Sequence, residues 1–289
     1  MRQKSGAMMH EPSFFTTPQG RKIACHVTQG QGPGVVFLGG FKSDMQGTKA
    51  VHLQDWAQAQ GRAFMRFDYS GHGASSGDFL DGCIGDWFED ALAVIEGLTQ
   101  GPQVLVGSSM GGWIALQLAR QIPQRVSGLV GIAAAPDFTE EIWAGLDDTQ
   151  RADMQANGKV AMPSDYSDSP YFITRRLIED GRTRLVLAAP LPLPFPVRLL
   201  QGTADTDVST TTALHLLDHA TGPDIRLTLV KGADHRFSTQ GCLAAIIAAV
   251  TDCLKGGGEA PFNLAAGGVL PRAQIVEIAV QARDGVTCP

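Results

Sequence analysis

VLVGSSMGG, residues 104–112, is the stretch that decides the fold. It begins as an apolar run typical of a buried strand and leads into Trp113 to Arg120, whose wider apolar spacing indicates an amphipathic helix. Between them lies Gly-x-Ser-x-Gly with Ser109 at its centre. A sharp turn from strand to helix strains the serine and leaves room only for glycine two residues to either side. This context favours a candidate nucleophile at a helix N-terminus over a chance glycine-serine turn.

Outward from this stretch, short apolar runs bounded by glycine alternate with helical stretches, as in parallel strands joined by crossover helices. We expect an α/β fold with a mostly parallel twisted sheet, helices on both faces, and an opening β-hairpin at Phe14 to Val27. The predicted buried strands are 35–38, 63–68, 104–107, 127–133, 197–201 and 225–230. The predicted helices are 47–60, 84–98, 110–120, 208–220 and 238–254.

One interval, residues 135–193, is far longer than a plain crossover needs, and we expect it to form an inserted lid. Trp143, Met162 and Tyr166 in this interval either offer apolar surface to a substrate or pack the lid onto the body. Residues 1–255 are expected to form a single domain that includes the lid. Residues 256–289, rich in Gly and Ala, are expected to form a flexible tail, with a helix or strand at Ile275 to Ala282.

The composition excludes several classes of protein. The chain has 289 residues, a formal net charge of -6 and 18% charged residues, which offers no basic field for nucleic acid. It has no apolar stretch of membrane-spanning length and no signal-peptide pattern, so a cytoplasmic location is expected. A monomer or dimer is expected as well. Its five cysteines are scattered, without the paired spacing of metal or redox sites, so they are expected to be reduced and mostly structural.

A serine hydroxyl needs a general base, and His235 is the best candidate among the seven histidines. It follows the predicted strand 225–230, which places it at the carboxyl edge of the sheet, where Ser109 also lies. His72 also follows a strand, but it precedes the serine in the chain and its glycine-rich surroundings suit a turn. Strand or helix faces carry His26, His52, His215 and His219, where a surface histidine or a satisfied core histidine is the better interpretation.

Two carboxylates follow the predicted strand 197–201 and are candidates for the acid that orients the histidine. Asp205 is favoured because it lies in the turn itself, whereas Asp207 is interpreted as an N-cap or first-turn carboxylate of the next helix. The chain order is then Ser109, Asp205, His235.

Acyl transfer also requires two amide donors for the oxyanion. One is expected from Met110, directly after the nucleophile, and the other from Phe41, in the loop after the strand 35–38. Gly39-Gly40 before Phe41 is alternatively only a tight turn.

Three stretches, GFKSDMQGTKA (40–50), RFDYSG (66–71) and GPQVLVGSSMGGW (101–113), together with ADHR (233–236), carry a closer resemblance. Residues 14–255 resemble the α/β-hydrolase superfamily, and these stretches resemble its subfamily of the tenth abhydrolase-domain protein. That subfamily is known for an acyl-glucuronide esterase and S-depalmitoylating thioesterase. The resemblance places Ser109, Asp205 and His235 on the family's triad. It implies hydrolysis of small-molecule esters or thioesters through an acyl-enzyme, without metal or organic cofactor.

Two further questions stay open at this point. Arg175 and Arg176 either pair with a carboxylate of the substrate or form a solvated face of the lid. The fold also occurs in non-catalytic binding proteins, and the same triad serves carbon-carbon bond hydrolases and peptidases.

Overall fold

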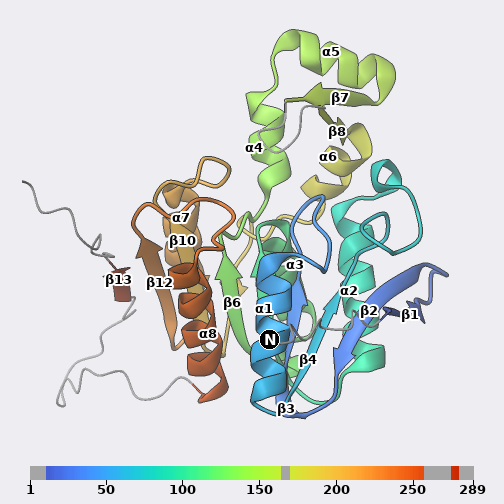
Figure 1. The fold of residues 1–289 in the computed structure, drawn as a ribbon. Helices are drawn as coiled ribbons and strands as arrows, with labels where there is room; N and C mark the ends of the chain where they lie inside the picture. Colours follow the sequence, from blue (N-terminus) through green and yellow to red (C-terminus); the bar gives the residue numbers. More distant parts are fainter. Residues whose placement is uncertain (1–10, 164–169, 257–274, 280–289) are drawn as a thin grey trace, which may run out of the picture.

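A nine-stranded sheet forms the centre of the molecule, and helices cover both of its faces (Figure 1). The computed structural model describes residues 11–163 and 170–256, and the backbone of 275–279. The strand order is β1-β2-β4-β3-β5-β6-β10-β12-β13; the β1–β2 and β2–β4 pairs are antiparallel and all others are parallel. The strands are β1 (Ser13–Thr16), β2 (Lys22–Thr28), β3 (Gln31–Leu38), β4 (Arg62–Phe67), β5 (Gln103–Ser108), β6 (Val126–Ile132), β10 (Val197–Gly202), β12 (Ile225–Val230) and β13 (Ile275–Ala279). The predicted α/β fold is therefore confirmed.

Five helices pack on the sheet and enclose two hydrophobic clusters. One face carries α1 (Thr48–Ala59) and α8 (Gln240–Leu254), and the other carries α2 (Ile84–Leu98), α3 (Met110–Gln121) and α7 (Thr210–His219). Every residue of β5 is buried, because a strand covered on both faces meets no solvent. No helix among residues 11–163 and 170–256 has the length and hydropathy that a bilayer span requires.

The carboxyl edge of the sheet has a switch point between β3 and β5. From β3 the chain continues through α1 to β4 on one side, and only later returns to β5 on the other side. Leu38 at the end of β3 is in register with Gly107 near the end of β5. The loop after β3 and the turn after β5 therefore emerge next to each other, which is where open α/β sheets bind their ligands.

The interval between β6 and β10 forms a small layer above that edge (Figure 1). It contains α4 (Phe138–Gly145), α5 (Asp148–Asn157), α6 (Arg175–Arg182) and the hairpin of β7 (Lys159–Met162) and β8 (Tyr171–Thr174). The end of this interval carries β9 (Leu191–Pro192), which pairs with β11 (Ala220–Thr221). Outside the interval, short 3-10 helices lie at Phe79–Asp81 (η1) and Pro123–Arg125 (η2). We call residues 135–193 the lid.

The lid is fastened to the start of α2. The carboxylate of Asp180 in α6 accepts a hydrogen bond from the amide of Gly85 (2.7 Å), and Arg176 pairs with Asp86 (2.7 Å). The N-cap residue of α2, Cys83, makes no capping hydrogen bond with its own side chain. Asp180 therefore satisfies a helix-start amide that has no acceptor within the helix.

Part of the predicted tail joins the sheet as β13, parallel to β12 and in register from Arg226–Ile275 to Val230–Ala279. The rest of the tail, residues 257–274 and 280–289, lies outside the described residues. The expected flexibility of the tail therefore stays a prediction.

Candidate active site

Ser109 occupies the turn from β5 to α3 with a backbone conformation that residues other than glycine rarely adopt (φ 54°, ψ -119°). Its amide donates to Ile132 of β6 (2.9 Å), and its carbonyl accepts from Ala135 (3.1 Å), so the neighbouring strand holds the turn. A Cβ at Gly107 would collide with the carbonyl of Gly111, and a Cβ at Gly111 with that of Leu38. The two glycines of the motif are thus required by close backbone approach.

Asp205 and His235 meet above the ends of the neighbouring strands β10 and β12. Nδ1 of His235 lies 3.1 and 3.0 Å from the two carboxylate oxygens of Asp205, whose side chain is fully buried. The amides of Asp207 and Val208 also donate to this carboxylate (2.9 Å each), as does the side chain of Gln201 (3.0 Å). Burial by itself raises the pKa of Asp205, but the hydrogen bonds from His235 and the amides outweigh it and hold the pKa below its usual value.

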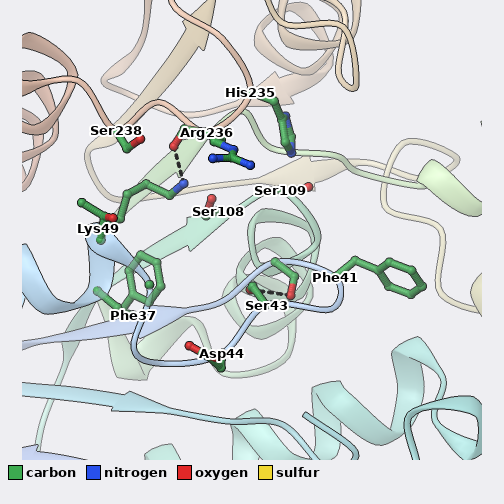
Figure 2. Close-up of a pocket in the computed structure, with 14 residues that line it drawn as sticks. Phe37, Phe41, Ser43, Asp44, Lys49, Ser108, Ser109, His235, Arg236 and Ser238 are labelled. Carbon is green, nitrogen blue, oxygen red and sulfur yellow. Dashed lines mark hydrogen bonds between the residues drawn. The ribbon is translucent and has the colours of Figure 1, made fainter. Parts of the chain in front are cut away.

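The carboxylate decides which ring nitrogen of His235 carries the proton. An ionised carboxylate only accepts hydrogen bonds, so Nδ1 must be the donor, and in the neutral imidazole Nε2 then carries the lone pair. Ser109 and His235 line one pocket of about 370 Å³, and Figure 2 shows the imidazole above the Ser109 hydroxyl. Within the described residues no hydrogen bond yet joins the two side chains.

Asp207 does not have the role predicted for it. Helix α7 begins at Thr210, and its N-cap is Ser209, whose hydroxyl accepts from the amide of Thr212. The carboxylate of Asp207 instead lies 3.9 Å from Nε2 of His235. The prediction was wrong because the loop after β10 is longer than the apolar pattern indicates. With Asp205 and His235, Asp207 forms the one set of possible metal ligands that the described residues contain.

The two amides predicted to bind an oxyanion lie at the switch point. Gly40, in the loop of residues 39–47 between β3 and α1, comes so close to the nucleophile that a Cβ there would lie 3.4 Å from Cβ of Ser109. The amides of Phe41 and Met110 have no acceptor among the described residues. The Phe41 ring extends away from Ser109 (Figure 2).

Two buried side chains that sequence reasoning did not assign to the site make hydrogen bonds to the β3–α1 loop (residues 39–47). Asp68 accepts from the amide of Met45 (2.6 Å), and Nε2 of His72 lies 3.3 Å from the amide nitrogen of Lys42. Both residues follow β4, and each contact spans at least 23 positions of the chain. A pattern read along the sequence carries no signal for such contacts.

Lys49, at the start of α1, is a further residue that the sequence did not indicate. Its ammonium group lies in the pocket with Ser109 and donates to the carbonyl of Arg236 (2.5 Å; Figure 2). Burial lowers the pKa of Lys49 to about 8, against the opposing effect of nearby carboxylates such as Asp234. Lys49 therefore ties the loop that carries His235 to the start of α1.

Two of the apolar lid residues predicted to contact substrate, Trp143 and Met162, do not line this pocket. The guanidinium groups of Arg151 and Arg182 lie 5.7 and 4.8 Å from the ring centroid of Trp143. Met162 ends β7, where its sulfur accepts from the side chain of Gln150. Tyr166 lies outside the described residues. A substrate contact for these residues stays a prediction.

The two lid arginines have protein partners. Arg175 pairs with Glu179 one turn along α6 (3.7 Å), and both side chains are more than half exposed. Arg176 is bound by the carboxylate of Asp86 and by the carbonyl of Asp81. Neither arginine lines the pocket that contains Ser109. These contacts account for Arg176 as a link between the lid and α2.

The sequence and the structure both match known proteins. The family profile described as "Alpha/beta hydrolase family" matches residues 35–265. A rat protein named palmitoyl-protein thioesterase ABHD10, mitochondrial, is 34% identical over 84% of this chain and 82% of its own length. A crystallised protein from Agrobacterium vitis S4 has a TM-score of 0.81 and 43% identity, over 84% of this chain and 98% of that one. The structure of mouse ABHD10 has a TM-score of 0.79 and 33% identity, over 85% and 99% of the two chains.

Proposed function

Because this chain belongs to the α/β-hydrolase family, we propose that it is a serine hydrolase that cleaves carboxylic esters or thioesters through an acyl-enzyme. The observation that carries the proposal is the geometry around His235. Its Nδ1 is bound to the buried Asp205 carboxylate, and its ring shares a pocket with the strained Ser109. The names of the mammalian relatives support thioester hydrolysis.

In the proposed mechanism, Ser109 forms a bond to the carbonyl carbon of the substrate while its hydroxyl proton passes to Nε2 of His235. Asp205 holds the imidazole in position and stabilises its positive charge. The amides of Phe41 and Met110 donate to the oxyanion. Collapse of this intermediate breaks the bond to the leaving alcohol or thiol, which takes the proton from His235. Water then attacks the acyl-enzyme and gives a proton to His235. As the bond between the acyl carbon and the Ser109 oxygen breaks, His235 returns this proton to that oxygen, and the acid is released.

The first test is covalent labelling. A fluorophosphonate probe is expected to label the wild-type protein and to fail on Ser109→Ala, whose hydrolysis of p-nitrophenyl esters falls by roughly 10³-fold or more, since the nucleophile is lost. Ser108→Ala is the matched control, because it removes the neighbouring hydroxyl and keeps the nucleophile. A folded wild type that takes no label contradicts the proposal and favours a binding protein. A Ser109→Ala variant that is still labelled contradicts the assignment of Ser109 as the nucleophile.

The substrate class is decided by comparing kcat/KM for p-nitrophenyl esters, acyl thioesters and acyl glucuronides. Carbon-carbon bond and peptide hydrolysis use the same groups and are included as further substrates. The expected cytoplasmic location stays a prediction, since the mammalian relatives are named mitochondrial. The expected monomer or dimer is checked by light scattering.

A further inference from the structure

We propose that His72 is a positioning residue, which holds the β3–α1 loop so that the Phe41 amide can bind the oxyanion. The inference rests on the proposed function, because it assigns a role in that reaction. It starts from the contact between Nε2 of His72 and the amide of Lys42, the residue directly after Phe41. His72 itself touches no substrate: it lies at 4% exposure beneath the loop.

The partners of the His72 ring fix its protonation. Nδ1 lies 3.2 Å from the carbonyl of Ser70, which only accepts, so Nδ1 carries the proton. Nε2 lies 3.3 Å from the Lys42 amide, which only donates, so Nε2 must be the acceptor. His72 is thus a neutral imidazole in one tautomer, and burial, which lowers its pKa, favours the same state.

The loop needs such an anchor, because Lys42 has a left-handed backbone (φ 57°) that a residue with a side chain adopts reluctantly. The hydrogen bond from the Lys42 amide to His72 offsets the conformational cost of this left-handed backbone. Without the bond, the turn is free to relax, and the peptide that carries the Phe41 amide moves with it.

An aromatic cluster transmits the same constraint to the Phe41 side chain. Phe79 and Trp87 each lie 5.1 Å from the His72 ring, centroid to centroid. The same two rings lie 4.8 and 5.9 Å from the ring of Phe41. His72 and Phe41 therefore share two neighbours, and the position of one ring depends on the position of the other.

Replacing His72 does not leave the carbonyl of Ser70, which accepts from its Nδ1, without a hydrogen-bond donor. The carbonyl of Ser70 also accepts from the indole of Trp87 (3.1 Å). His72→Phe therefore keeps an aromatic ring in the cluster and removes the acceptor. His72→Gln brings a carbonyl oxygen near the position of Nε2.

Kinetics on enzyme titrated with a fluorophosphonate separate positioning from folding, because only competent sites are counted. Since a misplaced catalytic group costs up to ~10²-fold, His72→Phe is expected to lower kcat about 10- to 100-fold and to change KM less than about twofold. His72→Gln is expected to recover at least about fivefold of that loss. Tyr69→Phe is the matched control: its ring lies 5.7 Å from His72, and its buried hydroxyl has no partner among the described residues.

Nitrogen-15 NMR of the wild-type imidazoles gives an independent readout. A neutral His72 with the proton on Nδ1 at pH 7 supports the proposal, and a ring protonated on Nε2 overturns it. An unchanged kcat in His72→Phe, or an equal loss in Tyr69→Phe, also overturns it while the proposed function stands. If Ser109 of the wild type takes no label, both proposals fall.

Discussion

At the scale of single residues, Asp205 is the side chain whose environment is most sharply defined. It is fully buried, and it accepts hydrogen bonds from an imidazole, an amide side chain and two backbone amides. Asp205→Asn keeps the shape but removes the charge and favours the wrong tautomer of His235. We expect kcat for p-nitrophenyl esters to fall by about 10⁴-fold.

The pKa of Asp205 also predicts how the difference in stability between the wild type and Asp205→Asn depends on pH. Since the folded pKa lies below the reference value of 3.8, the unfolded chain binds the proton first as the pH falls. The carboxylate's contribution is therefore complete above about pH 5 and is lost as the pH falls through the folded pKa. Urea unfolding should show Asp205→Asn less stable than the wild type by about 1–3 kcal/mol at pH 7, with a smaller difference at pH 3. Asp234→Asn, an exposed carboxylate beside His235, is the control; a gap that does not change with pH contradicts the assignment.

Residue patterns predicted part of this site and missed the rest for a physical reason. Ser109, Asp205 and His235 each follow an apolar run, and the end of a buried strand is readable along the chain. Lys49 contacts Arg236, which lies 187 positions away in the chain, and His72 contacts Lys42, which lies 30 positions away. Only the folded sheet brings these partners together.

At the scale of elements, the packing of α3 against β3 decides how closely Ser109 approaches the β3–α1 loop. A Cβ at Gly111 would collide with the carbonyls of Leu38 and Gly39, which are backbone atoms and cannot rotate away. Gly111→Ala is therefore expected to lower the free energy of unfolding by about 1–3 kcal/mol, measured by urea titration. Gly145→Ala at the end of α4, where a Cβ meets no atom within 4 Å, is expected to change it by less than about 0.5 kcal/mol. Equal effects of the two substitutions would contradict the close approach.

The parallel strands and the helices of the body were predictable, because strands buried on both faces are continuous apolar runs between glycines. The secondary structure of the lid was not. Its hairpin strands β7 and β8 have four residues each, and the short helices α4 and α6 have eight, too few for a periodic pattern to stand out.

At the scale of the whole molecule, the lid is bound to the body at the start of α2. Asp180→Ala removes the acceptor of the Gly85 amide, and we expect a loss of about 1 kcal/mol, as for other helix caps. For a chain of this size that loss lowers Tm by about 2–4 °C. Differential scanning calorimetry measures the shift, and limited trypsin digestion should cut the lid faster. Glu179→Ala, which removes only an exposed pair, should match the wild type; if it loses as much, the link is not specific.

The switch point between β3 and β5 also determines when the site can form during folding. The β3–α1 loop and Ser109 become neighbours only when two strands separated by a complete strand and two helices have paired, and His235 joins from the last of the long parallel strands, β12. Closing such distant segments costs chain entropy before any contact repays it. Because these parts come from the loop after β3, the turn after β5 and the loop after β12, the site is complete only once the sheet from β3 to β12 is assembled.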